Sequence, residues 1–274
     1  MRYYRGSYRV CARPNREIMT VCKKGSLGTY FLTTTLMTAS LVACGGGGED
    51  DSGTGGTGGT GTTYAFVPPV VGSSRVYSET IVDNSNNTIE GLAYMRTVES
   101  VAADGTITES QQETTGPSAR INGTIYSITT ETQTYNSFGR ETGYTYTESD
   151  GSPGTCTYSP RAGGAVPPLQ VGQTWQLNYT LTCNANPAIN YAQNGSVVDV
   201  ESVTVPAGTF TALKLQTTTV WTDSAGTTHT QTTTNWMDTA TFHSVKESDT
   251  FVDSGTMPTN GYAVSRQIEL SSTS

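Results

Sequence analysis

The chain has 274 residues, a formal net charge of −8 at pH 7 and a sequence pI near 4.7. Seven of its 15 Lys and Arg precede Cys44, against one of its 23 Asp and Glu. From Cys44 onward the chain therefore carries 8 basic and 22 acidic residues, a net charge of −14. Such an acidic surface repels phosphate backbones, which argues against nucleic-acid binding.

Residues 1–43 have the layout of a secretory signal peptide. Lys23 and Lys24 form a positive region, the run 25–42 is uncharged, and small residues lead into Cys44. Residues 1–18 are long and basic for such a segment, so Met19 is a candidate for the true start. The alternative is an uncleaved membrane helix, which the threonines of the uncharged run disfavour.

Leu41-Val42-Ala43-Cys44 resembles the lipobox of bacterial lipoproteins. The resemblance implies lipidation of the Cys44 thiol, cleavage before Cys44 and acylation of the new amino terminus. Each buried methylene contributes about 0.8 kcal/mol, so several acyl chains on one residue hold durably. Gly45, rather than an aspartate, follows the cysteine, and by the same resemblance this favours the outer membrane. We expect an exported protein held at the cell envelope by a lipid anchor.

Residues 44–63 are predicted to form the lipidated cysteine and a flexible linker. The stretch 45–63 is rich in Gly and Thr and contains no apolar residue. Its root-mean-square reach is about 25 Å. The linker would hold the following domain away from the membrane.

Residues 64–274 are predicted to form a single all-β domain. Threonine-rich, β-branched and aromatic runs are separated by turn pairs such as Asp104-Gly105 and Asp150-Gly151. The clearest strand is 174–183, in which Trp175, Leu177, Tyr179, Leu181 and Cys183 share one face. We expect an antiparallel meander of about ten to twelve strands, curled into a barrel or half-barrel. A β-sandwich is the alternative.

Two cysteines remain once the leader and Cys44 are set aside. Cys156 and Cys183 form an even pair in an exported chain, a compartment in which disulfides persist. Closing this loop would stabilise the fold by about 3.5 kcal/mol in the chain-entropy treatment. We predict a disulfide between them.

Two stretches within residues 169–248 carry a resemblance: the run from Leu169 to Trp175, and the run from Val203 to Lys214, with Trp236 and Val245-Lys246 following. The set resembles exported bacterial proteins of unknown function whose fold is similar to the curved half-barrels of the lipoprotein carriers LolA and LolB. The residues themselves indicate structure: Pro206 and Gly208 suit a tight turn between strands. The resemblance implies no binding residue.

Catalytic and metal-binding patterns are sparse. Phe251-Val252-Asp253-Ser254-Gly255-Thr256 resembles the active-site loop of aspartic proteases, a chemistry that requires two carboxylates. Asp223 lies in a poor second copy, and a hairpin turn explains both stretches. His229 and His243 are the only histidines, and we expect both at the surface. No zinc or other cofactor motif is present, so we predict no catalytic residue, no metal site and no cofactor.

The sequence therefore predicts a non-enzymatic envelope lipoprotein whose β-domain binds a hydrophobic ligand or an envelope protein. A structural or surface-interaction module without a cavity is the second hypothesis, and an aspartic-type hydrolase the third. If the barrel holds a cavity, its candidate lining residues are four aromatic side chains: Trp175, Tyr179, Trp221 and Trp236. The plainer explanation is that these side chains fill the core.

Overall fold

The structure is a computed structural model, which describes residues 9–10, 21–22, 61–114, 120–121, 124–125, 130–147, 153–184, 186–223, 226–254 and 263–274. Cys44, the predicted cleavage site, Met19 and linker residues 45–60 lie outside the described residues. The signal peptide, the anchor and the domain boundaries drawn from them stay predictions.

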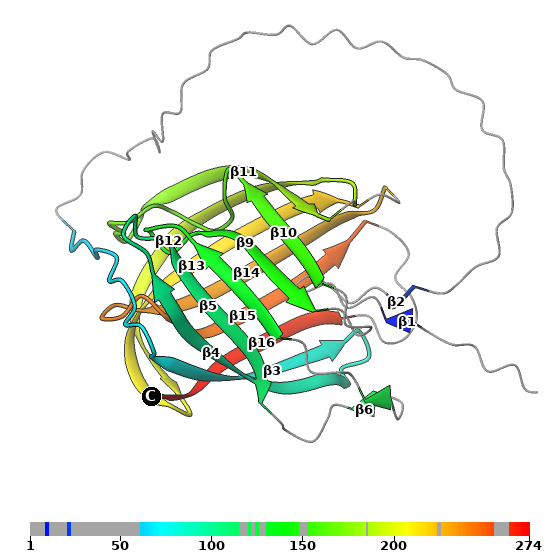
Figure 1. The fold of residues 1–274 in the computed structure, drawn as a ribbon, viewed down its shortest axis with the longest axis horizontal. Helices are drawn as coiled ribbons and strands as arrows, with labels where there is room; N and C mark the ends of the chain where they lie inside the picture. Colours follow the sequence, from blue (N-terminus) through cyan, green and yellow to red (C-terminus); the bar gives the residue numbers. More distant parts are fainter. Residues whose placement is uncertain are drawn as a thin grey trace, which may run out of the picture.

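The described residues fold into a closed antiparallel barrel of twelve strands (Figure 1). The strands are β3 (Ser74–Asp83), β4 (Thr88–Val101), β5 (Ile107–Thr114), β8 (Thr130–Tyr135), β9 (Glu141–Thr147), β10 (Pro153–Ser159), β11 (Thr174–Cys183), β12 (Ile189–Val205), β13 (Gly208–Thr222), β14 (Thr228–Asp238), β15 (Ser244–Asp253) and β16 (Ala263–Thr273). Two-residue pairs lie outside it: β1 (Arg9–Val10) with β2 (Val21–Cys22), and β6 (Arg120–Ile121) with β7 (Thr124–Ile125). The predicted all-β meander is confirmed as a barrel, and the sandwich alternative is wrong.

Each barrel strand pairs with its neighbour in the chain, and the last strand closes the ring by pairing with the first. At the seam, the Ser74 N–H donates to the Ser274 carbonyl at 3.0 Å, and the Ser274 N–H donates to the Ser74 carbonyl at 2.9 Å. Closure leaves no unpaired strand edge within the barrel, which removes the usual route to edge-to-edge association.

The period-two pattern of the sequence places apolar side chains on the buried face. The strand predicted over 174–183 is β11, with the same bounds, and its Tyr179 and Leu181 are buried while Asn178 and Thr182 are exposed. In β13 the odd-numbered residues from Leu213 to Trp221 are more buried than the residues between them. Side-chain alternation thus decided which face of each strand turns inward.

The long hairpin of β12 and β13 bends over one end of the barrel. Its register shifts between Val197 and Asp199, where a bulge bends the ribbon. Its turn follows Val205, and Gly208 has a φ of +137°, a value that glycine tolerates best. The Ala207 N–H donates to the Leu270 carbonyl at 3.1 Å, which ties the tip to β16. Figure 1 shows this hairpin curling beside the C-terminus.

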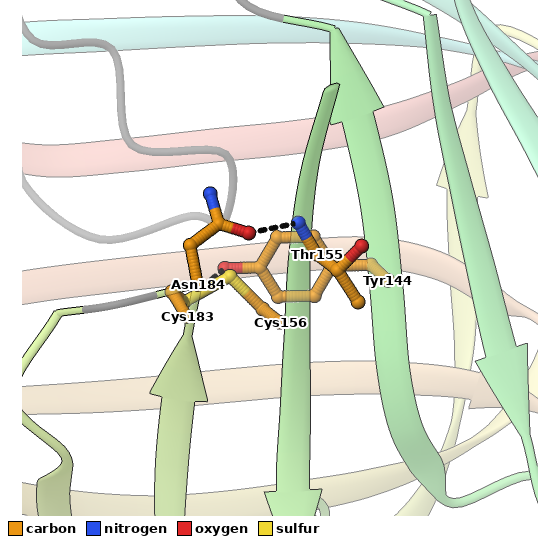
Figure 2. The surroundings of a disulfide bond; sticks show 5 residues. All are labelled: Tyr144, Thr155, Cys156, Cys183 and Asn184. Carbon is orange, nitrogen blue, oxygen red and sulfur yellow. Dashed lines mark hydrogen bonds between the residues drawn. A yellow bond between two sulfur atoms is a disulfide. The ribbon is translucent and has the colours of Figure 1, made fainter. Parts of the chain in front are cut away.

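The predicted disulfide is present and joins two neighbouring strands. Cys156 of β10 and Cys183 of β11 are directly opposite each other, with Cα atoms 4.0 Å apart. Figure 2 shows Asn184 beside it, whose Oδ1 accepts from the Thr155 N–H at 2.9 Å, and the Tyr144 hydroxyl lies 3.7 Å from the Cys183 sulfur. Cys156 is 1% exposed, so the bridge is protected by the barrel interior.

The proline-containing loop between β10 and β11 packs against the segment that precedes β3. It crosses to the N-terminal segment, where Leu169 and Tyr64 exchange two backbone hydrogen bonds of 2.8 Å. Nearby, the Phe66 and Phe242 rings meet edge to face at 5.9 Å. These contacts build an apolar cluster with Ala165, Val197 and Leu213.

Candidate functional site

Seven rings from six consecutive strands form one continuous arc on the buried face. Successive ring centroids lie 4.9 to 6.2 Å apart, within the range of favourable aromatic pairing. The members of this aromatic arc are Tyr146, Tyr144, Tyr158, Tyr179, Tyr191, Trp221 and His229.

Sheet register explains half of the arc. Tyr179 is opposite Tyr191, Tyr191 is opposite Trp221, and Trp221 is opposite His229, so one row across four strands carries four rings. Cross-strand neighbours on one face stand about 5 Å apart, the spacing that stacked rings need. The next residue in the row is Asp253 of β15.

His229 ends the arc between two carboxylates. Its Nδ1 lies 2.7 Å from the Asp253 Oδ1, its Nε2 lies 3.3 Å from the Asp223 Oδ2, and its ring stacks on Trp221. Both nitrogens can donate to ionised carboxylates only when the ring holds both protons. His229 is 7% exposed, so its predicted surface position is wrong. Its two acidic partners compensate its burial.

The contacts of His229 also show where the stretch that resembles an aspartic-protease loop begins. Asp253 ends β15, whereas Gly255 and Thr256 lie outside the described residues. Asp223 and Asp253, the two carboxylates that shared-proton catalysis would need, each contact a different nitrogen of His229. The ring therefore sits between them, an arrangement unlike a carboxylate pair that shares one proton.

A hollow of about 610 Å³ lies over the strands that carry the arc. Its lining residues come from β10 to β13 and from the loop before β12: Ser159, Asn178, Tyr179, Thr180, Ala188, Asn190, Tyr191, Ala192, Val220, Trp221 and Thr222. Tyr179, Tyr191 and Trp221 are buried, while Asn178, Asn190 and Thr222 are exposed. The hollow therefore has a mixed lining of buried aromatic rings and exposed amides and hydroxyls.

The four aromatic residues predicted from the sequence divide between three places. Tyr179 and Trp221 meet in the arc and beside the hollow. Trp175 packs instead in the apolar cluster of Leu169 and Leu213. Trp236 lies between the Lys214 and Lys246 ammonium groups, 5.4 and 5.8 Å from its ring centre, and donates to Glu201. Alternation along each strand determined which face a side chain occupies, but it did not determine where around the barrel that side chain lies.

A buried ion cluster was not anticipated. Arg266 of β16 donates from Nε to the Asp249 Oδ2 at 2.7 Å and from an Nη to the Glu247 Oε1 at 2.8 Å, and all three residues are under 5% exposed. Gln231 also donates to Asp249. Burial raises the pKa of the Asp249 carboxyl, Glu247 raises it further, and Arg266 opposes both. The sequence did contain one indication of this cluster: alternation along the last strand places Arg266 on the same face as the apolar residues.

Two kinds of feature are absent from the described residues. No group of three or more His, Cys, Asp and Glu is placed there to hold a metal ion. No helix with the length and hydropathy of a membrane span occurs in that part of the chain.

The comparisons with known proteins give two distant structural matches. No protein-family model and no curated protein matches the sequence. A Bacteroides fragilis protein described as exported, with a YmcC-like fold, has 11% identity and a TM-score of 0.44. A Parabacteroides distasonis protein described as a lipoprotein has 14% identity and a TM-score of 0.45. Each match covers 78% of this chain and 100% of the other.

Proposed function

We propose that this chain is a lipid-anchored protein of the outer membrane whose barrel binds an envelope partner and catalyses no reaction. The anchor part rests on Cys44 and the linker that follows it. The binding part rests on one observation: the hollow of about 610 Å³ on the wall formed by β11, β12 and β13.

The lining of the hollow favours a partner that forms neutral hydrogen bonds. Asn178, Asn190 and Thr222 present amide and hydroxyl groups that can both donate and accept, and no lining residue is charged. Thr180 already donates to Asn190 at 2.8 Å, which orients that amide. A protein segment with exposed backbone or amide groups meets these requirements.

The contacts of His229 and Asp253 support the non-catalytic part of the proposal. Both nitrogens of His229 bind carboxylates of its own chain, so the ring cannot take a substrate proton without breaking one of those contacts. Asp253 is used in the same cluster, and its side chain is 7% exposed.

Site-specific photocrosslinking tests the proposal. A photoreactive residue replaces Asn190 in the lipidated protein in its native envelope, and a matched control carries it at exposed Gln267 of β16, outside the hollow. We expect a discrete adduct from position 190 and none from position 267. No adduct from position 190, or the same adducts from both positions, would contradict partner binding at the hollow.

A hydrophobic ligand is the second candidate, and the aromatic arc favours it, since seven rings give one wall of the barrel a strongly apolar face. Solvent extraction of the purified protein, followed by mass spectrometry, would identify a stoichiometric apolar molecule. A Trp221→Ala variant should retain less of it than the native protein. Extracts that contain no such molecule would exclude this candidate.

A further inference from the structure

Arg140 is a buried cation for which the described residues supply no counter-charge. It ends the turn between β8 and β9 and is 7% exposed. Within the described residues its guanidinium has no ion-pair or hydrogen-bond partner, and its Nε is fully buried. Burial, and then the nearby Arg161 cation, lowers the pKa of Arg140 to about 10. The group therefore remains charged at neutral pH.

The other buried arginines of the barrel have carboxylate partners. Arg75 pairs with Glu109, and Arg266 pairs with Asp249 and Glu247. A buried charge without a partner costs several kcal/mol, which is why such groups are nearly always paired. Arg140 instead has a second arginine as its charged neighbour. An anion from outside the chain would balance the charge of Arg140.

The loop between β10 and β11 covers the Arg140 side chain and holds it in place. The Ala162 N–H donates to the Glu141 carbonyl at 2.9 Å, which fixes the loop to the start of β9. Two glycines follow. A Cβ atom at Gly163 would lie 3.4 Å from the Arg140 Cδ, and one at Gly164 would lie 3.4 Å from its Nη1. Glycine allows the loop backbone to approach the guanidinium closely.

Trp175 supplies a second unused donor beside the same glycine. Its indole Nε1 is buried and has no hydrogen-bond partner among the described residues. A Cβ atom at Gly164 would lie 3.2 Å from the Trp175 Cε2, the carbon bonded to Nε1. The Arg140 Nη1 and the Trp175 Cε2 can therefore be no more than about 6.6 Å apart. The donor Nε1 is at most one bond length further from Nη1, and two oxygens of one oxyanion can accept from two donors that far apart.

We propose that Arg140 and the Trp175 indole N–H form a binding site for an oxyanion, either free or as the acidic group of a small ligand, beneath the 160–164 loop. The forked guanidinium suits a carboxylate, phosphate or sulfate group, whose oxygens accept two parallel hydrogen bonds. Arg161 strengthens the attraction through its charge. This site is separate from the hollow on β11 to β13 and does not depend on the proposed partner.

Anion titrations of the purified full-length protein test the site. Acetate, inorganic phosphate and sulfate are each added at millimolar concentrations, with sodium chloride keeping the ionic strength constant. Tryptophan emission and the thermal midpoint are both recorded, because Trp175 would report on its own hydrogen bond. Arg140→Gln is the test variant. Arg96→Gln is the matched control, since Arg96 already contacts Gln111 and two tyrosine rings.

We expect saturable changes with at least one anion in the native protein and in Arg96→Gln, and at least tenfold weaker binding in Arg140→Gln. A carboxylate preference would indicate an organic acid, and a phosphate or sulfate preference a tetrahedral oxyanion. Without anion, Arg140→Gln should melt no lower than the native protein, because it removes an uncompensated charge. Equal responses of native protein and Arg140→Gln, or a lower midpoint of Arg140→Gln without anion, would overturn the proposal.

Discussion

The buried Arg266 cluster allows a quantitative stability prediction. Arg266→Met keeps much of the side-chain volume but leaves the Asp249 and Glu247 carboxylates buried without their cation. Removing one partner from a buried ion pair costs about 3–5 kcal/mol. For a domain of this size, each 1 kcal/mol lowers the thermal midpoint by about 2–4 °C. We therefore expect the midpoint to fall by roughly 6–20 °C.

The pH dependence of the variant provides a second readout. Burial already raises the pKa of Asp249, and loss of Arg266 removes the cation that opposed this shift. The folded variant then binds protons more tightly than the unfolded chain, so its stability falls as pH rises from the unfolded value of about 3.9 through the raised folded value. The destabilisation should be smaller at pH 5 than at pH 8.

Urea unfolding followed by tryptophan emission and far-UV circular dichroism at both pH values measures these effects. Asp249→Asn is the matched control, because it leaves Arg266 with one carboxylate, Glu247, and should therefore cost less than Arg266→Met, about 1.5–3 kcal/mol. The double variant should be more stable than Arg266→Met alone. A loss below about 1 kcal/mol in Arg266→Met, or equal losses at pH 5 and pH 8, would refute the reasoning.

Three further predictions concern other parts of the chain. Replacing Cys156 and Cys183 by serine should lower the unfolding free energy by about 3.5 kcal/mol, and an unchanged urea midpoint would contradict this. Burial, then Arg75, lowers the pKa of His243 from 6.5 to about 3, so stability should fall as pH drops below 6.5, and His243→Gln should reduce that fall. Intact mass should show an acylated chain that begins at Cys44, and Cys44→Ser should leave the membrane fraction; an unmodified thiol would exclude the anchor.

The sequence alone determined the fold class and the bridge between Cys156 and Cys183. Alternation with period two sets which face of a strand is apolar, and it does so locally, as the match between residues 174–183 and β11 shows. Turn residues such as Pro206 and Gly208 separated the strands correctly. These signals are encoded within a few residues of each position, so no distant contact was needed to read them.

Only the tertiary structure decided what those strands bring together. Closure between β16 and β3, and the row from Tyr179 to Asp253, depend on register between strands, which period-two alternation leaves open. The same register buried His229 between two aspartates and Arg266 beside Asp249, and it left Arg140 without a counter-charge among the described residues. From sequence alone, charged residues are expected to face solvent. Their burial requires partners, and only pairing between distant strands supplies those partners.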